Sequence, residues 1–257
     1  MPASHPSAEN WPRPVFDPDQ RRLVPEVMDR PDLDPALHRQ ALAALRRINR
    51  LSRTTASLWS QIAPLARTSY NPPLRVLDVA CGGGDVLWGL ASLAHQHSCH
   101  LEFSGCDFSP TAIEHAVRAG SQTGASPSDQ EVPSAPRFFL HDVLAHPLPP
   151  ADIVTCTLFL HHLDESQAVR LLSRLWQAAT RRVIVSDLRR SRVGYWLAHA
   201  VGRLVTRSPV VHVDGPLSVA AAWSLPEVER LVATAGWTRH TLRRTWPQRF
   251  LLVGDRE

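Results

Sequence analysis

The segment Val76-Leu-Asp-Val-Ala-Cys-Gly-Gly-Gly-Asp-Val86 carries the strongest fold signal in this chain. Apolar residues over 75–80 predict a buried strand, and a helix is expected over about 85–95. A strand that enters a glycine turn and continues into a helix points backbone N–H groups at a ligand. Glycine suits such a turn because a side chain would block close approach and resist the backbone angles. The segment therefore predicts a ligand-binding βα unit.

The rest of the chain continues this alternation of strands and helices. Strands are expected at 101–106, 138–140, 153–160, 182–187, 238–244 and 249–253. Helices are expected from about 109 and at 165–179, 191–208 and 225–235. Alternation at this pitch implies a mostly parallel sheet with helices on both faces.

The N-terminal part has a different character. Residues 1–35 are rich in Pro, Asp and Arg and are interpreted as an irregular arm. From 35 to 65 apolar residues recur at helical spacing, which predicts one or two amphipathic helices interrupted near Ser52. We expect Asn71-Pro-Pro to end this segment, and the stretch 120–136 to form a surface insertion.

Composition limits the class of protein. The chain is 44% hydrophobic, and its formal net charge of +4 is carried entirely by arginine, because it contains no lysine. A net charge this small does not indicate a nucleic-acid partner. No apolar run reaches the roughly 20 residues that a spanning helix needs. The N-terminus also lacks a secretory pattern, so a cytoplasmic location is expected.

Neither the cysteines nor the histidines form a recognisable metal pattern. The four cysteines lack paired spacings, so a disulfide framework is not expected. The densest cluster is His95, His97, Cys99 and His100. Its spacing fits no standard zinc pattern, so we expect a solvated loop and no bound metal.

Two acidic residues sharpen the ligand prediction. Asp78 lies inside the first strand, where a dinucleotide-binding fold usually carries an apolar residue. A buried carboxylate needs a partner, and the amino group of a methionine moiety would be a suitable one. Asp107 follows the second strand, close to the spacing at which an acidic residue meets a ribose diol.

In these motifs the sequence resembles the class I S-adenosylmethionine-dependent methyltransferases. Motif I of that family is similar to 76–85, and its acidic ribose-binding motif is similar to Gly105-Cys-Asp-Phe-Ser109. Its adenine-contacting motif resembles Asp142-Val143, and its fourth motif resembles Asp152-Ile-Val-Thr-Cys-Thr-Leu-Phe-Leu-His-His-Leu163. The resemblance covers about residues 70–190. It implies an α/β fold with a Rossmann-like, doubly wound, seven-stranded, mostly parallel sheet, an antiparallel last strand and an N-terminal helical lid.

The resemblance also implies S-adenosyl-L-methionine as cofactor and S-adenosyl-L-homocysteine as product. It divides the chain into an arm and helical lid, 1–70, and a methyltransferase domain, 71–257, with 191–216 as a substrate-lid insertion. The residues implied to bind the cofactor are Asp78, Ala80, Cys81, Gly82, Gly84, Asp107, Phe108, Asp142, Val143, Thr157 and Leu158. Among them, Asp107 would hold the ribose hydroxyls, Phe108 would flank the adenine, and Asp142 would accept from its amino group.

Three histidines are candidate catalytic bases: His161, His162 and His212. A phenol with a pKa of ~10 needs a base to react at neutral pH. His161 and His162 follow the fourth strand, at the rim where α/β folds bind ligands, and at most one is expected to point into the pocket. His212 and Asp214 precede Gly215-Pro216, where a turn would orient them inward; an exposed turn capped by the Asp is the alternative.

The expected function is methylation of a small molecule, most directly at a hydroxyl of an aromatic, quinone-like or polyketide acceptor. The alternatives are C-methylation of such a ring and a non-catalytic regulatory module that binds the cofactor. Apolar residues of 191–208, among them Trp196 and Leu204, would line the acceptor pocket, and its arginines would meet an anionic group. The same pattern also describes a helix on a membrane surface, or an amphipathic helix with one solvated face.

Two further enzyme classes fit less well. Methyltransferases of nucleic-acid bases usually carry an Asn/Asp-Pro-Pro-aromatic motif after strand four, whereas this chain has Thr157-Leu-Phe-Leu there. A nicotinamide oxidoreductase shares the glycine turn, but Asp78 and the compact Gly82-Gly-Gly84 argue against it. No nucleic-acid partner is therefore expected.

Overall fold

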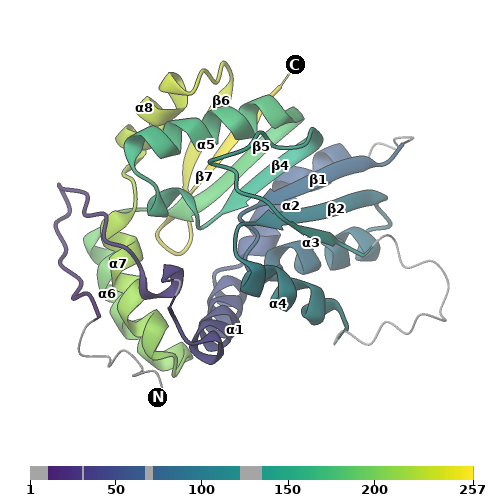
Figure 1. Cartoon of the computed structure of the whole chain (residues 1–257). Coiled ribbons are helices and arrows are strands. Elements are labelled where there is room, and N and C mark those ends of the chain that lie inside the picture. The colour runs from purple at the N-terminus through teal and green to yellow at the C-terminus, as the bar shows by residue number, and fades with distance from the viewer. Residues whose placement is uncertain (1–10, 31, 67–71, 122–134, 257) are drawn as a thin grey trace.

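A computed structural model describes residues 11–30, 32–66, 72–121 and 135–256 (Figure 1). Its centre is a seven-stranded sheet in the order β3-β2-β1-β4-β5-β7-β6. The strands are β1 Leu74–Val79, β2 Leu101–Asp107, β3 Arg137–Leu140, β4 Ala151–Thr157, β5 Ala179–Leu188, β6 His240–Thr245 and β7 Arg249–Asp255. Strands β1 to β5 run parallel, while β7 runs antiparallel to both of its neighbours. The predicted doubly wound sheet with an antiparallel last strand is confirmed.

The helices surround this sheet. They are α1 Pro35–Leu51, α2 Thr54–Ala66, α3 Asp85–Gln96, α4 Pro110–Ser121, α5 Glu165–Ala178, α6 Arg192–Val205, α7 Pro209–Ala221 and α8 Leu225–Thr234, with short 3-10 helices η2 Val27–Asp29 and η3 Leu160–His162. The expected break near Ser52 is present, because Ser52 is the C-cap of α1 and α2 begins two residues later. Residue 71 and most of the predicted insertion, 122–134, lie outside the described residues.

Two sequence-based boundaries are wrong. The fourth strand ends at Thr157 rather than at 160, because Leu158 has a left-handed φ of 54° that turns the chain out of the sheet. The expected turn at Gly215-Pro216 lies inside α7, which Ser208 caps and Pro209 opens. Proline is well tolerated at the first helical position, and Pro216 only removes one hydrogen bond from a helix whose ends are well fixed.

Apolar side chains bury both faces of the sheet. On one face α5 and α8 pack through residues such as Leu172 and Leu231. On the other face α2 and α3 pack through residues such as Leu58 and Leu90. Helix α2 therefore belongs to the central core, although it falls within the range 1–70 expected to form the arm and lid. No helix in the described part of the chain is long and apolar enough to cross a bilayer.

Residues 11–30, here called the strap, cross the carboxyl end of the sheet without regular structure except at η2. Figure 1 shows the strap in purple beside α6 and α7. The Arg21 guanidinium donates to the carbonyls of Ala221 (2.5 Å), His161 (2.8 Å) and Leu163 (2.7 Å). It also lies 3.7 Å from the ring centroid of Trp223. The predicted arm is thus irregular in backbone but fixed to the domain by specific contacts.

Replacement of Arg21 should release the strap. In Arg21→Ala three carbonyls lose a charged donor, and each such hydrogen bond contributes about 1.5–3 kcal/mol. We expect much faster hydrogen exchange at the amides of Val27 and Met28, measured by mass spectrometry. Arg22→Ala is the matched control, because exposed Arg22 contributes only a backbone bond to Ala220. Equal exchange in both variants would contradict the anchoring role.

Candidate active site

Asp78 lies at the carboxyl end of β1 and is buried. One carboxylate oxygen, Oδ1, accepts from the Thr155 hydroxyl at 2.6 Å. The other, Oδ2, is buried without a hydrogen-bond partner among the described residues. Burial raises the pKa of Asp78 to about 7. A carboxylate held in this way is poised to accept a cationic donor.

The glycine turn after β1 leaves space at one position and is tightly packed at another. Gly82 has a φ of +53°, and a Cβ added there would meet no atom within 4 Å. Gly84 has a φ of +72°, but its Cβ would lie 2.8 Å from the Phe138 ring and 2.9 Å from Ala116. Open space beside Gly82 suits close approach of a ligand, whereas glycine at 84 is required by packing.

Asp107 ends β2 and is held by backbone donors. Gly82 N–H donates to its Oδ2 and Ser109 N–H to its Oδ1, both at 2.9 Å. Burial raises the pKa of Asp107; the carboxylate of Asp29 adds to the rise, and His38 of α1 opposes it. The strap and α1 therefore approach the carboxyl end of β2. Each carboxylate oxygen keeps a lone pair for a further donor.

The other predicted cofactor residues differ in how they are placed. Phe108 is 61% exposed, so ordinary core packing does not account for it. Asp142 caps its own turn by accepting from Leu144 N–H (2.8 Å) and Ala145 N–H (3.2 Å), while Val143 is buried. Cys81 is buried with its thiol pKa raised by burial, and its N–H donates to the Cys106 carbonyl at 3.0 Å.

Strained backbone marks the ends of two central strands. Ala80, after β1, has a φ of 55°, and Leu158, after β4, has a φ of 54°. Left-handed conformations in residues with a side chain cost about 1–3 kcal/mol and concentrate at functional sites. The Leu158 N–H donates to the Ser186 carbonyl at 3.0 Å, while Thr157 is half-buried at the same rim. Both turns flank the point where the strand order reverses, which is where such folds bind ligands.

These features fit S-adenosylmethionine. The unpaired oxygen of Asp78 suits an ammonium group, the open space beside Gly82 suits a ligand that approaches the backbone, and Asp107 retains acceptor capacity for hydroxyls. The site therefore offers a partner for each polar end of this cofactor.

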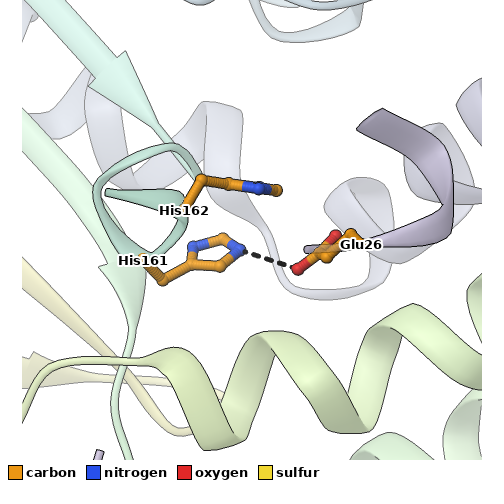
Figure 2. A group of neighbouring side chains, drawn as sticks. All are labelled: Glu26, His161 and His162. Carbon is orange, nitrogen blue, oxygen red and sulfur yellow. Dashed lines mark ion pairs between the residues drawn. The ribbon is translucent and has the colours of Figure 1, made fainter. Parts of the chain in front are cut away.

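A buried histidine lies at the rim beyond β4. His161 Nδ1 is 2.6 Å from Asp187 Oδ1, at the end of β5, and its backbone N–H donates to Asp187 Oδ2 at 3.2 Å. Its Nε2 lies 3.7 Å from Glu26 Oε1 of the strap. The dashed line in Figure 2 marks this ion pair. His161 thus lies between two carboxylates from parts of the chain far apart in sequence.

The two carboxylates keep His161 protonated. Burial lowers the pKa of His161, but the charges and hydrogen bonds of Asp187 and Glu26 outweigh it and raise the pKa to about 10. Burial likewise opposes ionisation of Asp187 and Glu26, yet the histidines hold the pKa of both carboxyls below its usual range. An imidazolium at neutral pH cannot accept a proton, so His161 is a poor general base.

The adjacent His162 has a different environment. Its Nδ1 is 2.9 Å from Asp29 Oδ2, which leaves Nε2 available. Burial lowers its pKa, but Glu26 and Asp29 outweigh that effect, so the pKa lies above the usual value. The His162 side chain is 21% exposed, and together with Glu26, Asp29 and His161 it lines a cavity of about 200 Å³ under the strap. Both rings are oriented by a carboxylate and line this cavity, but the His162 ring is the more exposed of the two.

The same side chains also offer a donor set for a metal ion. One atom each of Glu26, His161 and His162 lies within 4.8 Å of the others. Carboxylates on the Nδ1 atoms of both rings would support such a site. Metal-bound imidazole must be neutral, however, and a pKa of about 10 at His161 opposes that state. A metal ion bound here would have to displace the proton of His161.

The third candidate, His212, is not brought together with this pair. It lies on α7, and its Nε2–H donates to the Thr206 carbonyl at 2.8 Å. The expectation that a turn orients His212 and Asp214 inward is wrong, because both residues are helical. Asp214 instead accepts from Val27 N–H (2.8 Å) and Met28 N–H (2.9 Å), which fixes η2.

Sequence analysis missed the acidic partners of the histidines: Glu26, Asp29 and Asp187. Glu26 and Asp29 lie in an aperiodic arm more than 130 residues before the histidines. Asp187 ends a predicted strand, so its place at the sheet rim was a signal that could have been used.

A glycine turn after β1, an acidic residue after β2 and this strand order define a nucleotide-cofactor enzyme with a Rossmann-like fold. Residues 77–184 match the model of a family described as a methyltransferase domain. Comparison with curated protein sequences found no match.

Solved structures share the fold. Magnesium protoporphyrin IX methyltransferase (ChlM) from Synechocystis PCC 6803, with bound S-adenosylhomocysteine, has a TM-score of 0.55 and 21% identity over 80% of this chain and 83% of that one. A SAM-dependent methyltransferase from Aquifex aeolicus has a TM-score of 0.58 and 15% identity over 87% and 98%. An O-methyltransferase family 2 protein from Planctomyces limnophilus, in complex with apigenin, has a TM-score of 0.52 and 18% identity over 80% and 62%.

Residues 77–184 therefore form a methyltransferase domain, and the chain shares its fold with S-adenosylmethionine-dependent methyltransferases. The family match ends at 184, before α6 and α7, and begins after the strap and α1. The elements around the histidine pair therefore lie largely outside the matched region.

The stability of the protein should depend on the charge of His161. Its folded pKa is raised above the ordinary 6.5, so its contribution is complete below pH 6.5 and is lost as pH rises to about 10. We expect His161→Gln to lower the free energy of unfolding by about 3–5 kcal/mol at pH 6.5, with a gap that narrows toward pH 10. Urea unfolding of wild type and variant at several pH values measures the free energy of unfolding and its pH dependence. The more exposed His162→Gln is the control. A gap independent of pH would exclude the buried imidazolium.

Proposed function

We propose that this methyltransferase acts on a hydroxyl of an aromatic, quinone-like or polyketide small molecule, with His162 as the general base. The observation that supports this most directly is the environment of His162. Asp29 orients the ring through Nδ1, and Nε2 is left available beside the cavity under the strap. This is the arrangement that a base needs when an acceptor must lose a proton.

The cofactor would lie along the carboxyl ends of β1, β2 and β4. Asp78 would accept from its amino group, and Asp107 from its ribose hydroxyls. Ala80, Cys81, Gly82 and Gly84 would form the turn beside it, Phe108, Asp142 and Val143 would border the adenine, and Thr157 and Leu158 would border the sulfonium. When bound, S-adenosylmethionine supplies an electrophilic methyl group for in-line displacement, so the protein contributes mainly by positioning.

His162 would activate the acceptor. A phenolic hydroxyl with a pKa of ~10 is almost entirely protonated at neutral pH. His162 Nε2 would take that proton as the oxygen gains its methyl group, and the Asp29 carboxylate would stabilise the resulting imidazolium. His161 would act as a positioning residue, because it is already protonated and holds Glu26 against the histidine pair.

The fold neighbours support an oxygen acceptor without specifying it. One is described as an O-methyltransferase family 2 protein in complex with apigenin, and another as a putative O-methyltransferase from Nostoc punctiforme. The chain spans 62% and 57% of these two proteins. C-methylation of a ring remains the second candidate, because it also benefits from deprotonation of a ring hydroxyl.

Calorimetric titration with S-adenosylmethionine, S-adenosylhomocysteine and NADH tests the cofactor site. Wild type should bind the two sulfur nucleotides and not NADH. Asp107→Ala should weaken binding by about 10- to 100-fold, because it removes hydrogen bonds to a charged acceptor. Asp142→Ala should have a smaller effect, because that residue is exposed and caps its own turn. Undiminished binding by Asp107→Ala would refute its assignment.

The pH dependence of turnover tests His162. Only the neutral ring is a base, so kcat/KM with a phenol panel should rise with pH through a pKa above 6.5. His162→Gln should lower kcat by about 10²- to 10⁴-fold with cofactor affinity unchanged. Asp29→Asn should move the acid limb of the kcat/KM profile to lower pH, because this variant lacks a carboxylate that raises the pKa of His162.

Two controls make this result specific. Asp32→Asn changes an exposed carboxylate that pairs with Arg30, and it should leave the profile unchanged. Prolonged dialysis against EDTA should also leave turnover unchanged. Activity that is lost on dialysis and restored by one divalent ion would contradict the base assignment and assign Glu26, His161 and His162 as metal ligands.

A further inference from the structure

Helix α6 has an inner face of small residues. A Cβ added at Gly202 of α6 would lie 3.9 Å from the His212 ring of α7. A Cβ added at Gly215 of α7 would lie 3.8 Å from the Ala198 Cβ of α6. Gly194 and Gly202 are buried. These small residues let α6 pack closely on α7, as the adjacent ribbons in Figure 1 show. Close packing on one side fixes which residues face outward.

The outer face of α6 is apolar and lacks a partner among the described residues. Val193 is 57% exposed, Trp196 72% and Leu204 86%. With exposed Ala200 they recur at the three- and four-residue intervals of one helical stripe. Trp196 and Leu204, which the sequence analysis expects to line an acceptor pocket, are thus two of the most exposed apolar side chains of the described residues. Such a stripe is too exposed to be part of the protein's own core.

Arginine accompanies this stripe, and acidic residues are absent from it. Arg192 and Arg203 of α6 are exposed, as is Arg207 two residues beyond the end of the helix. No Asp or Glu occurs between 188 and 213, nor between 35 and 51 in α1. The two helices that meet here are thus purely basic, although the whole chain has a net charge of only +4.

A groove joins the stripe to α1. It has a volume of about 510 Å³, and three arginines contribute to its lining: Arg47 of α1, and Arg203 and Arg207 at the end of α6. Apolar atoms of Ala43, Leu204 and Val205 complete it. Guanidinium groups around a partly apolar groove match a phosphate that carries an apolar chain.

We propose that the outer face of α6 docks on an anionic lipid bilayer, with phospholipid headgroups in the groove beside α1. Trp196 and Leu204 would enter the headgroup–acyl boundary, where tryptophan and leucine of interfacial helices lie. Arg192, Arg203 and Arg207 would bind headgroup phosphates. The proposed docking surface lies outside the histidine pair, so the test of docking does not depend on the identity of the methyl acceptor.

A bilayer accounts for the whole surface. An acidic protein or nucleic acid would use the arginines but would leave Trp196 and Leu204 in water. A second copy of this chain would place these arginines against the basic residues of its own face. Only an anionic amphiphilic surface satisfies both the charge and the exposed apolar stripe.

Co-sedimentation of the full chain with vesicles tests the proposal. We expect binding to phosphatidylcholine vesicles that contain about 30% phosphatidylserine, and weak binding to pure phosphatidylcholine. An arginine near an anionic membrane contributes about 1 kcal/mol, which is about fivefold in affinity. Arg203→Gln/Arg207→Gln should therefore weaken binding by about 25-fold. Trp196→Ala/Leu204→Ala should weaken it by at least about tenfold at high salt, where apolar burial dominates.

Matched variants separate this surface from net charge. Arg170→Gln/Arg230→Gln removes two exposed arginines from α5 and α8, and it should bind vesicles as wild type does. All variants should retain calorimetric binding of S-adenosylhomocysteine, which shows that they fold. Equal weakening by both arginine pairs would overturn the proposal, as would an absence of binding to anionic vesicles. A concentration-dependent dimer abolished by Trp196→Ala/Leu204→Ala would assign the face to self-association instead.

Discussion

The position of the strap over the rim of the sheet depends on one buried histidine. His161 is enclosed between Asp187 of the sheet and Glu26 of the strap, and none of the three charges is tolerable in that place without the others. Because Glu26 belongs to an otherwise irregular segment, the ion cluster requires the strap to close over the rim. Closure in turn delivers Asp29 to His162, so the orientation of the candidate base is a consequence of burying its neighbour.

The cofactor side uses the opposite arrangement. There a carboxylate, Asp78, is buried with one oxygen left without a donor, and its pKa rises to about 7. The carboxylates around His161 find their partners within the protein, whereas one oxygen of Asp78 has none among the described residues. In the proposed function that oxygen would accept from the cofactor's amino group.

The sequence allowed the sheet and its cofactor turn to be predicted because their signals are local. Each strand is signalled by its own apolar run, and the glycine turn lies with Asp78 and Asp107 inside a stretch of about 35 residues. Glu26 and Asp29 gave no such signal, because their role arises from closure onto residues more than 130 positions away. His212 was misjudged for another reason: Gly215-Pro216 is typical of a turn, but the capped ends of α7 keep it helical. At Gly215-Pro216 the packing of α7 outweighs the local preference of these two residues for a turn.

The region that matches the family and the region that would recognise an acceptor are separate in this chain. The match ends at 184, while the strap, α6 and α7 lie outside it and contact one another directly. Phe16 of the strap stacks on Tyr195 of α6 at 4.5 Å, and Tyr195 donates to the Pro14 carbonyl at 3.2 Å. Any surface that engages the outer face of α6 therefore acts on a helix joined to the strap, which carries Glu26 and Asp29. A surface docked on α6 would thus be joined through direct contacts to the segment that lies beside His161 and His162.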